Sequence, residues 1–308
     1  MSAESIVTAY EVAVPTRQTQ DLPGLDKYII PGIEYVKQEY WDNEGKPHLK
    51  DYVGSGKLKE IFALITGGDS GIGRATGLLF AKEGLKGVTI SHLPQEKEDA
   101  IASADAISKT GCEVMTIALD LQHDSQCKTL VESHMQKFGT LNILVNNAAK
   151  QIIERHVENI DLDKVRSTFE SNILQMIAVT KFAVPHMKRG SSIINTTSVV
   201  AYAGSAKLLD YSSTKGAITS FTRSLAKQLA PRRIRVNAVA PGPVVTALQP
   251  ASREEDDMEG FGRGMPMHGR AAQPAELAPS FVFLASPDAN VMSGAVMHVN
   301  NGMHVGGS

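Results

Sequence analysis

Short apolar runs alternate with longer amphipathic stretches along the chain from residue 59 onward. Short apolar runs bounded by turn residues are typical of strands that are buried on both faces. The predicted strands are residues 61–66, 87–91, 113–119, 141–146, 191–197 and 234–240, with a last strand at the sheet edge, 295–300. Helical patterns separate these strands, so the order predicts an α/β fold: a Rossmann-type doubly wound parallel sheet in a single domain.

Residues 1–58 do not follow this alternation. Residues 22–57 are rich in Pro, Gly, Tyr and charge and show no sustained helical or strand period. We therefore divide the chain into an irregular N-terminal extension, residues 1–58, and a Rossmann-fold domain, residues 59–308. The extension carries many apolar and aromatic residues: Tyr28, Ile29, Ile30, Ile33, Tyr35, Val36, Tyr40 and Trp41. These are too many for a solvated tail, so we expect the extension to pack on the folded body or to reach a neighbouring subunit.

Composition and charge narrow the possible partners. The chain has 308 residues, of which 42% are hydrophobic and 21% charged, as in a globular protein with a substantial core. The net charge of −2 and the absence of a basic block give no reason to expect nucleic acid or an anionic membrane as partner. No apolar run approaches the roughly 20 residues of a membrane span, and the N-terminus lacks the pattern of a secretory signal. We expect a cytoplasmic protein with two reduced cysteines, Cys112 and Cys127, and no metal site.

A glycine-rich segment follows the first predicted strand directly, in the stretch TGGDSGIGRATGLLFAKEG. Gly67, Gly71 and Gly73 lie between this strand and the next helix, where the pyrophosphate of a dinucleotide would bind. Glycine permits the tight turn and lets the backbone approach the phosphates. A glycine trio alone is a weak signal, but the flanking strand and helix make it strong.

Several motifs, in the right order, resemble the short-chain dehydrogenase/reductase family over about residues 59–305. They are the spacing TGxxxGxG, the segment NNAA at 146–149, the pair Tyr211 and Lys215, and PGPVVT at 241–246. The phrases YVGSGKLK and LLDYSSTKGAI are most similar to a subgroup with an N-terminal extension, the glucose and ribitol dehydrogenase-like proteins. The chain departs from the family pattern at Ala149 and in VNNG at 299–302.

This resemblance implies an NAD(P)(H)-dependent oxidoreductase that acts on CH–OH groups, forms a homotetramer or homodimer, and takes a small-molecule carbonyl or alcohol as substrate. The implied catalytic residues are Asn172, Ser198, Tyr211 and Lys215. The implied cofactor-binding residues are Gly67, Asp69, Ser70, Gly71, Ile72, Gly73, Ser91, His92, Asp120, Leu121, Asn147, Ala148, Tyr211, Lys215, Pro241, Gly242, Val244 and Thr246. Within this set the family uses Asp120 and Leu121 at the adenine, and Thr246 at the nicotinamide carboxamide.

The pair Tyr211 and Lys215 fits this chemistry. The two residues are four apart, on one face of the predicted helix, which by itself also fits an ordinary helix surface. A free tyrosine has a pKa of about 10, and a nearby ammonium group favours the phenolate. We therefore predict that Tyr211 is the proton donor and that Lys215 lowers its pKa. Ser198 would hold the substrate oxygen, and Asn172 resembles the residue that holds a water behind the lysine.

The residues at the end of the second predicted strand bear on the choice between NADP(H) and NAD(H). An acidic residue there would bind the ribose 2′-hydroxyl and repel a 2′-phosphate. The chain has Ser91 and His92 instead, with Lys97 further along, which favours NADP(H) over NAD(H). Two residues favour NAD(H): Ser70 stands where many NADP enzymes of the family carry a basic residue, and Glu96 could approach the ribose.

Two further alternatives stay open. The chain could be a nucleotide-binding protein of the same fold recruited to a non-redox catalytic or binding role, although the full set of four catalytic residues favours an oxidoreductase. The segment after Thr246 corresponds to the family's lid over the substrate. Its apolar residues would either give the lid an adaptable inner face or pack as ordinary core: Met258, Phe261, Met265 and Met267.

Overall fold

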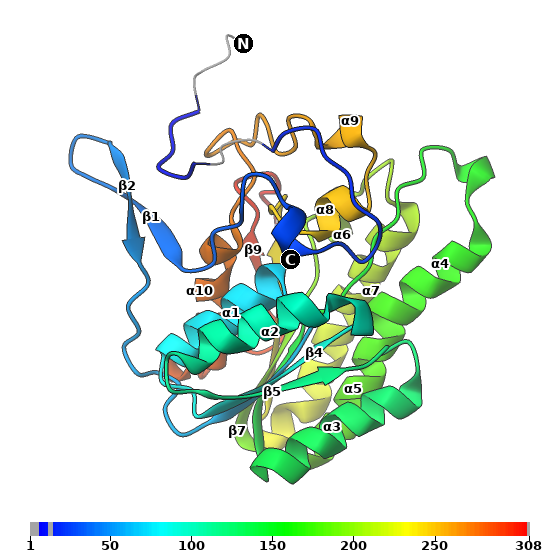
Figure 1. Cartoon of the computed structure of the whole chain (residues 1–308). Helices are drawn as coiled ribbons and strands as arrows, with labels where there is room; N and C mark the ends of the chain where they lie inside the picture. The colour runs from blue at the N-terminus through cyan, green and yellow to red at the C-terminus, as the bar shows by residue number, and fades with distance from the viewer. Residues whose placement is uncertain (1–5, 12–14, 307–308) are drawn as a thin grey trace.

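A parallel sheet of seven strands lies at the centre of the molecule (Figure 1), in the order β5-β4-β3-β6-β7-β8-β9. This computed structural model describes residues 6–11 and 15–306. The strands are β3 Phe62–Thr66, β4 Gly87–His92, β5 Glu113–Ala118, β6 Leu141–Asn146, β7 Met187–Thr196, β8 Arg235–Pro241 and β9 Val296–Val299. The strand order reverses between β3 and β6, so the predicted doubly wound α/β fold is confirmed.

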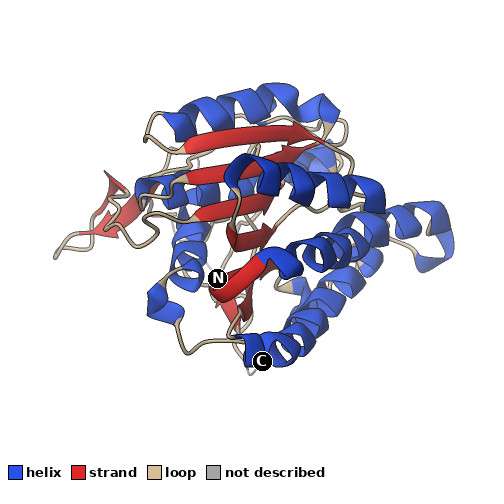
Figure 2. Cartoon of the chain, turned by 90° about the horizontal axis from the view of Figure 1, so that it is seen from below, coloured by secondary structure: helices blue, strands red, loops and turns tan. Residues whose placement is uncertain are grey.

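Helices cover both faces of this sheet, as Figure 2 shows from below. The helices with eight or more residues are α1 Gly71–Lys82, α2 Lys97–Ser108, α3 Asp124–Phe138, α4 Leu162–Phe169, α5 Gln175–Ala183, α7 Leu209–Leu229 and α10 Pro274–Ala285. Neighbouring residues of one strand point to opposite cores: Ile65 packs with α1 and α10, whereas Leu64 packs with α3, α5 and α7. This two-sided burial explains why the strands are continuous apolar runs in the sequence.

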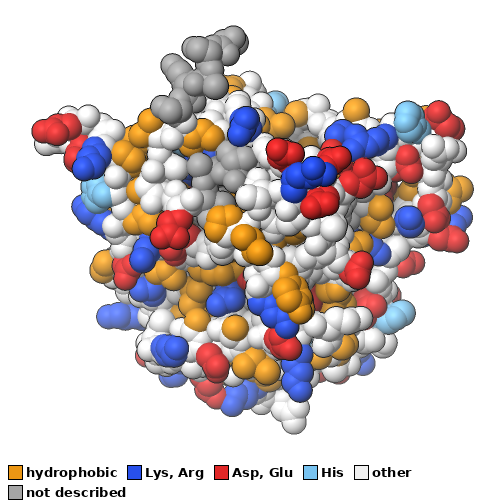
Figure 3. All heavy atoms as spheres, turned by 45° about the horizontal axis from the view of Figure 1, so that its top comes forward, with side chains coloured by type: hydrophobic (Ala, Val, Ile, Leu, Met, Phe, Trp, Pro, Cys, Tyr) orange, Lys and Arg blue, Asp and Glu red, His pale blue; other side chains and the backbone are white. Residues whose placement is uncertain are grey.

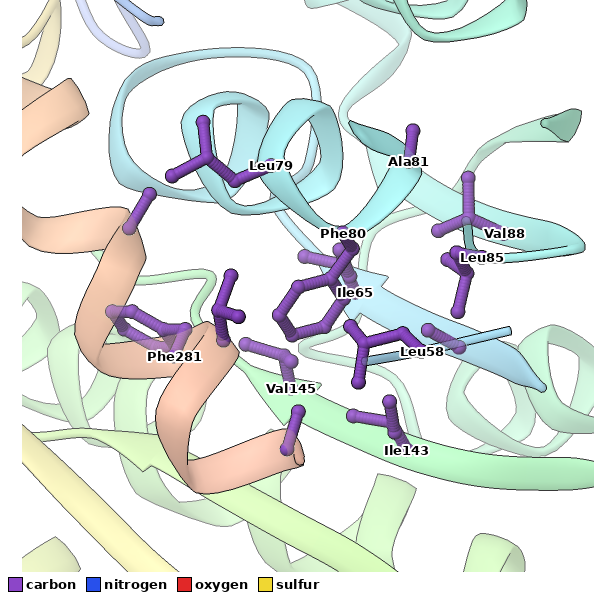
Figure 4. Packing of buried hydrophobic residues seen from close by; sticks show 14 of the residues in the cluster. Leu58, Ile65, Leu79, Phe80, Ala81, Leu85, Val88, Ile143, Val145 and Phe281 are labelled. Carbon is purple, nitrogen blue, oxygen red and sulfur yellow. The ribbon is translucent and has the colours of Figure 1, made fainter. Parts of the chain in front are cut away.

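The core on the α1 side is built from large side chains of distant elements. Figure 4 shows Phe80 of α1 and Phe281 of α10 beside Ile65 and Val145 of the sheet. All four side chains are fully buried, and Leu58 joins them just before the first strand of the sheet. The packing fixes α1, and therefore the glycine-rich turn that precedes it, against the end of β3.

The predicted strand bounds agree with the structure to within one or two residues, except in β7. This strand begins at Met187, four residues before the predicted start at 191. Met187 pairs with Leu141, and the register then shifts before Ile143. The intervening residues Lys188 to Gly190 are exposed and polar, so they carry no apolar signal for a strand.

The N-terminal extension is more regular than the sequence predicts. It contains a short 3-10 helix, Asp26–Tyr28, and an antiparallel hairpin of β1 Lys37–Trp41 and β2 Pro47–Asp51 that projects from the body (Figure 1). The hairpin turn is closed by Asp42, whose carboxylate accepts the backbone N–H groups of Glu44 and Lys46. The prediction of little regular structure is therefore wrong for the hairpin. Its strands are half-exposed on both faces, which removes the apolar alternation that marks a strand.

The extension packs on the body, as expected, but not with all of the residues that suggested it. Ile29 is buried against Val245, Ala247 and Ala271. Other members of the predicted set remain exposed: Tyr28, Ile30, Tyr40 and Trp41. Contact with a neighbouring subunit stays a prediction.

No helix in residues 6–11 and 15–306 is both long enough and apolar enough to cross a bilayer. Within the same residues, no group of three or more His, Cys, Asp or Glu side chains is arranged to hold a metal ion. Figure 3 looks onto the face that carries α8 (Leu248–Ala251), α9 (Glu255–Met258) and the hairpin. Acidic and basic side chains are interleaved there instead of forming a patch of one sign.

Candidate active site

A cavity of about 430 Å³ opens at the carboxyl ends of the central strands. Ligands of doubly wound sheets bind at this position, where the strand order reverses. Most of the residues predicted from the sequence line it: Gly67, Asp69, Ser70, Gly71, Ile72, Ser91, His92, Asp120, Leu121, Asn147, Ala148, Ser198, Tyr211, Lys215, Pro241, Gly242, Val244 and Thr246. Gly73 and Asn172 do not line the cavity.

The glycine-rich turn fits a dinucleotide because side chains would destroy its shape. Gly67 and Gly71 have φ values of +60° and +51°, which favour glycine. A Cβ atom on Gly73 would lie 1.9 Å from the carbonyl oxygen of Gly67, so the helix could not approach the strand. The amide of Asn147 donates to the same oxygen at 3.0 Å. The turn thus holds the N-terminus of α1 toward the cavity, where its free N–H groups favour an anion.

Asn172 is fully buried in a short π-helical segment, Glu170–Leu174, between α4 and α5. Its carboxamide oxygen accepts the backbone N–H of Lys150 at 2.7 Å, and its amide donates to the Lys150 carbonyl at 2.9 Å. The amide also donates to the Thr214 hydroxyl at 3.0 Å. Asn172 therefore joins the segment after β6 to helix α7. π-Helical turns of this kind are frequent at functional sites.

Ser198, Tyr211 and Lys215 meet at one end of the cavity. The ammonium nitrogen of Lys215 lies 5.3 Å from the centre of the Tyr211 ring and donates to the carbonyl of Thr196 at 2.9 Å. Burial raises the pKa of Tyr211 to about 12, opposed by a hydrogen bond from Ser198 and by the charge of Arg253. Burial also lowers the pKa of Lys215 to about 7.

The predicted lowering of the Tyr211 pKa by Lys215 is therefore not seen. The same burial that favours the neutral phenol weakens the charge on the neighbouring ammonium group, so the expected attraction is lost. A pKa of about 12 keeps Tyr211 protonated at neutral pH. This is the form that a proton donor needs.

The end of the cavity at Ser91 and His92 contains Glu96, the acidic residue that the sequence analysis gave as an argument for NAD(H). Glu96 lines the cavity beside Ser91 and His92, whereas Lys97 does not. The Glu96 carboxylate accepts the backbone N–H of Leu93 at 2.8 Å, which holds it in place. Burial raises the pKa of Glu96 to about 7. Lys97, the cation expected for a 2′-phosphate, is therefore absent from the wall of this cavity, while the carboxyl group of Glu96 is present.

Several lining residues escaped the sequence analysis. Leu22 and Pro23 come from the N-terminal extension, and no motif marks them. Gln249 of α8 lines the substrate end, where its side-chain oxygen accepts from Gln151 at 3.2 Å and from Arg253 at 3.1 Å. Gln151 follows the NNAA motif and Gln249 follows the PGPVVT motif. These two positions are the sequence signal for this group of polar side chains.

Of the two alternatives for the apolar residues after Thr246, the structure does not show an apolar inner face of the lid. Met258, Phe261, Met265 and Met267 are all absent from the cavity wall. Met258 is buried away from it, Phe261 packs against the Ile29 cluster, and Met267 is 69% exposed. The lid contributes Leu248 and Gln249 of α8 instead, because this helix follows Thr246 directly and the methionines lie further along the chain.

The family model described as Enoyl-(Acyl carrier protein) reductase matches residues 67–304. The chain belongs to the short-chain dehydrogenase/reductase family. As a member of this family it is an NAD(P)-dependent oxidoreductase, with the fold and the motif order that the sequence predicts.

Curated relatives cover nearly the whole chain. The uncharacterized oxidoreductase YhdF of Bacillus subtilis (strain 168) is 48% identical over 94% of this chain and 98% of its own. The NADPH-dependent aldehyde reductase 1, chloroplastic, of Arabidopsis thaliana is 46% identical over 88% of this chain and 94% of its own. The glucose and ribitol dehydrogenase of Daucus carota is 43% identical over 90% of this chain and 99% of its own, which confirms the predicted subgroup resemblance.

Solved structures share the fold over about four fifths of the chain. A short-chain dehydrogenase from Burkholderia cenocepacia J2315 in complex with NADP has a TM-score of 0.74 and 28% identity, covering 80% of this chain and 98% of its own. A 3-ketoacyl-(acyl-carrier-protein) reductase from Brucella melitensis complexed with NADH has a TM-score of 0.72 and 30% identity, covering 80% of this chain and 100% of its own.

Proposed function

We propose that this chain interconverts a small-molecule carbonyl compound and a secondary alcohol, with NADP(H) as the hydride carrier. One observation carries the proposal: Ser198, Tyr211 and Lys215 converge on one end of a cavity whose wall also contains the glycine-rich turn. A dinucleotide bound with its pyrophosphate at this turn supplies or accepts the hydride. A protein with a purely binding role has no need of a proton donor at the other end.

The residues of the chain supply the proton and hold the reacting oxygen. The Tyr211 phenol, kept protonated by burial, donates its proton to the carbonyl oxygen as the alcohol forms. The Ser198 hydroxyl lies beside this phenol and hydrogen-bonds the same oxygen, stabilising the charge that develops there. Lys215 is held by the Thr196 carbonyl at the ribose end of the site, where it returns a proton toward Tyr211. In the reverse direction Tyr211 accepts the alcohol proton.

Asn172 supports this arrangement from behind the cavity wall. Its contacts with Lys150 and Thr214 fix two neighbouring segments at once. Because both the amide nitrogen and the carboxamide oxygen take part in these contacts, we assign it a positioning role. The family's water-holding function for this residue stays a prediction.

The preference for NADP(H) is supported by the named relatives more than by the cavity wall. The Arabidopsis relative is named as NADPH-dependent, and the Burkholderia structure contains NADP. The Brucella structure contains NADH. A protonated Glu96, with its pKa raised to about 7, does not repel a 2′-phosphate and can donate a hydrogen bond to it. A ratio of kcat/KM for NADPH and NADH above one supports the preference, and a ratio below one refutes it.

A spectrophotometric screen tests the activity. Aldehydes, ketones, sugars and polyols are offered with NADPH, NADH and their oxidised forms, and absorbance of the reduced nicotinamide is followed. We expect turnover of at least one carbonyl–alcohol pair, lost in the Tyr211→Phe variant. Tight dinucleotide binding without turnover across the panel would instead favour the non-redox alternative.

We also propose that the protein assembles as a homotetramer or homodimer through α5 and α7. Apolar side chains lie exposed on this side of the molecule: Leu174 is 51% exposed, and Ile177 and Leu209 are each 40% exposed. Such residues favour contact with a second copy. Sedimentation equilibrium gives the subunit number, and Ile177→Glu should lower it. A wild-type monomer at micromolar concentration would contradict the assembly.

A cytoplasmic location is the last element of the proposal. Cys112 and Cys127 are buried and unpaired, and burial raises the pKa of both thiols to about 12. Unpaired thiols of this kind fit a reducing compartment. Microscopy of a fluorescent fusion tests the location, and a signal confined to another compartment would contradict it.

A further inference from the structure

We propose that residues 19–28 form a cofactor-binding strap: Leu22 and Pro23 pack on the bound dinucleotide, and the release of the strap limits cofactor exchange. The proposal rests on the proposed NADP(H) function. It begins from the cavity wall, in which Leu22 and Pro23 are the residues contributed by the N-terminal extension. The rest of the wall comes from the catalytic body, beginning at Gly67.

One end of the strap is fixed to helix α8, directly after the nicotinamide-side residue Thr246. The backbone N–H of Gln20 donates to the Pro250 carbonyl at 3.0 Å, and the Thr19 hydroxyl donates to the Arg253 carbonyl at 3.2 Å. Gly24 lies so close to α8 that a Cβ atom would be 2.6 Å from the carbonyl oxygen of Ala247.

The other end is fixed to the phosphate side of the cavity. The backbone N–H of Asp26 donates to the carboxylate of Asp99 in α2 at 2.8 Å. The Asp26 side chain is 8% exposed and lies 3.6 Å from the guanidinium group of Arg74 in the first turn of α1. Tyr35 donates to the same carboxylate, and its ring lies 4.5 Å below the Arg74 guanidinium carbon. These contacts place Asp26 beside the helix terminus that faces the pyrophosphate.

Leu22 and Pro23 lie between Gln20 and Gly24, which both contact α8. The chain then runs from α8 to Asp26 at the phosphate side, so the strap connects the two sides of the cavity. Leu22 is 41% exposed although it lines the cavity. A dinucleotide in the cavity would cover this apolar surface and gain its burial. Entry and exit would then require the anchors to open, because the strap crosses the cavity mouth.

Cofactor release rates test the strap without any substrate. NADPH is bound to the full chain, and its dissociation is followed by loss of nicotinamide fluorescence after addition of excess NADP⁺. We expect Leu22→Ala to raise the dissociation rate constant and the Kd for NADPH by about five- to tenfold, from the lost apolar burial. Ile30→Ala is the matched control, because Ile30 is a 65% exposed apolar residue of the same extension outside the cavity wall. It should leave both values unchanged.

Amide hydrogen exchange gives a second readout that does not depend on a variant. NADPH should slow the exchange of the Gln20 and Asp26 amides, which form the two anchors, by at least about tenfold. Equal release rates in wild type, Leu22→Ala and Ile30→Ala, with unchanged exchange at the anchors, would overturn the strap while leaving the proposed function intact. Failure of the wild type to bind NADPH or NADH would overturn the proposed function and the strap together.

Discussion

The side-chain amide of Asn172 donates a hydrogen bond of 3.0 Å to the hydroxyl of Thr214, the residue next to Lys215. The Thr214 hydroxyl donates in turn to the carbonyl of Tyr211 at 2.7 Å. A π-helical turn on one side of the site is thus connected to the helix turn that carries the proposed proton donor. The position of Tyr211 depends on this buried chain of hydrogen bonds.

Replacing Thr214 by Val should weaken both folding and turnover. The change keeps the shape but removes the hydroxyl, so the buried amide of Asn172 loses one acceptor, at a cost of about 1–3 kcal/mol in the free energy of unfolding. We expect kcat to fall more than KM rises, because the geometry of Tyr211 is disturbed. Thr214→Ser keeps the hydroxyl and is the control. Urea unfolding and steady-state kinetics measure the two effects. Equal stability and equal kcat for Thr214→Val and Thr214→Ser would disprove the dependence of Tyr211 on this hydrogen bond.

Tyr211→Phe should reduce kcat by at least about 10²-fold, the usual scale of general acid catalysis. The ring and its packing remain, so the Kd for NADPH should change little. Lys215→Ala should lower kcat and raise the Kd for NADPH, because Lys215 lies in the cavity wall next to Tyr211. Single-turnover kinetics and fluorescence titration give the two quantities, and near-normal turnover of Tyr211→Phe would remove the proton donor from the mechanism.

Cofactor preference should depend on pH through Glu96. Its pKa is raised from its ordinary value to about 7, so the carboxyl group is neutral below this pH and charged above it. A charge near the ribose costs a 2′-phosphate roughly 1 kcal/mol, so the ratio of kcat/KM for NADPH to NADH should fall about fivefold between pH 6 and pH 8.

Glu96→Gln should make this ratio independent of pH, since the amide keeps an acceptor for the Leu93 N–H but does not ionise. Glu98→Gln, at an exposed position two residues along, should preserve the fall. The same pH dependence in wild type and Glu96→Gln would assign it to another group.

Gly73→Ala should abolish tight cofactor binding even though Gly73 does not touch the cavity. Its Cβ atom would lie 1.9 Å from the Gly67 carbonyl oxygen, so the turn must open. Overpacking of this kind costs about 1–3 kcal/mol, which predicts an increase of roughly 5- to 150-fold in the Kd for NADPH. Gly32→Ala has nothing within 4 Å and serves as control. Calorimetric titration with NADPH gives the Kd of both variants. Equal values would mean that the turn tolerates a methyl group at Gly73.

Arg270→Met should destabilise the fold by about 3–5 kcal/mol, the usual effect of breaking a buried ion pair from one side. The Arg270 side chain is 1% exposed and bonds Glu39 of the hairpin at 3.0 Å and Glu276 of α10 at 2.8 Å. Both carboxylates would lose their counter-charge. Lys27→Met removes an exposed pair with Glu98 and should leave the urea midpoint unchanged. Similar midpoints for the two variants would show that the buried pair contributes nothing.

The strands of the sheet could be predicted because their residues are buried on both sides, as Leu64 and Ile65 show. The hairpin could not, because half-exposed strands lack a period and only the turn at Asp42 marks it. The order of the family motifs predicted most of the residues of the cavity wall. It could not show that Asn172 lies in a π-helical turn. Leu22 lines the cavity together with residues more than forty positions away, and no local pattern records such a neighbourhood. For the same reason the sequence left open whether the lid methionines face the cavity or pack as core.

The contact between Glu39 and Arg270 also constrains how such a chain can change over generations. Beneath the hairpin the arginine is shielded from water and pairs with Glu39 as well as with Glu276. In the open, a surface pair is worth about 1 kcal/mol at most. A descendant that lost the hairpin would leave the arginine with Glu276 alone in contact with water, and one that lost the arginine first would bury Glu39 without a counter-charge. The two features are therefore expected to be inherited or discarded as one unit, far from the chemistry that they help to hold in place.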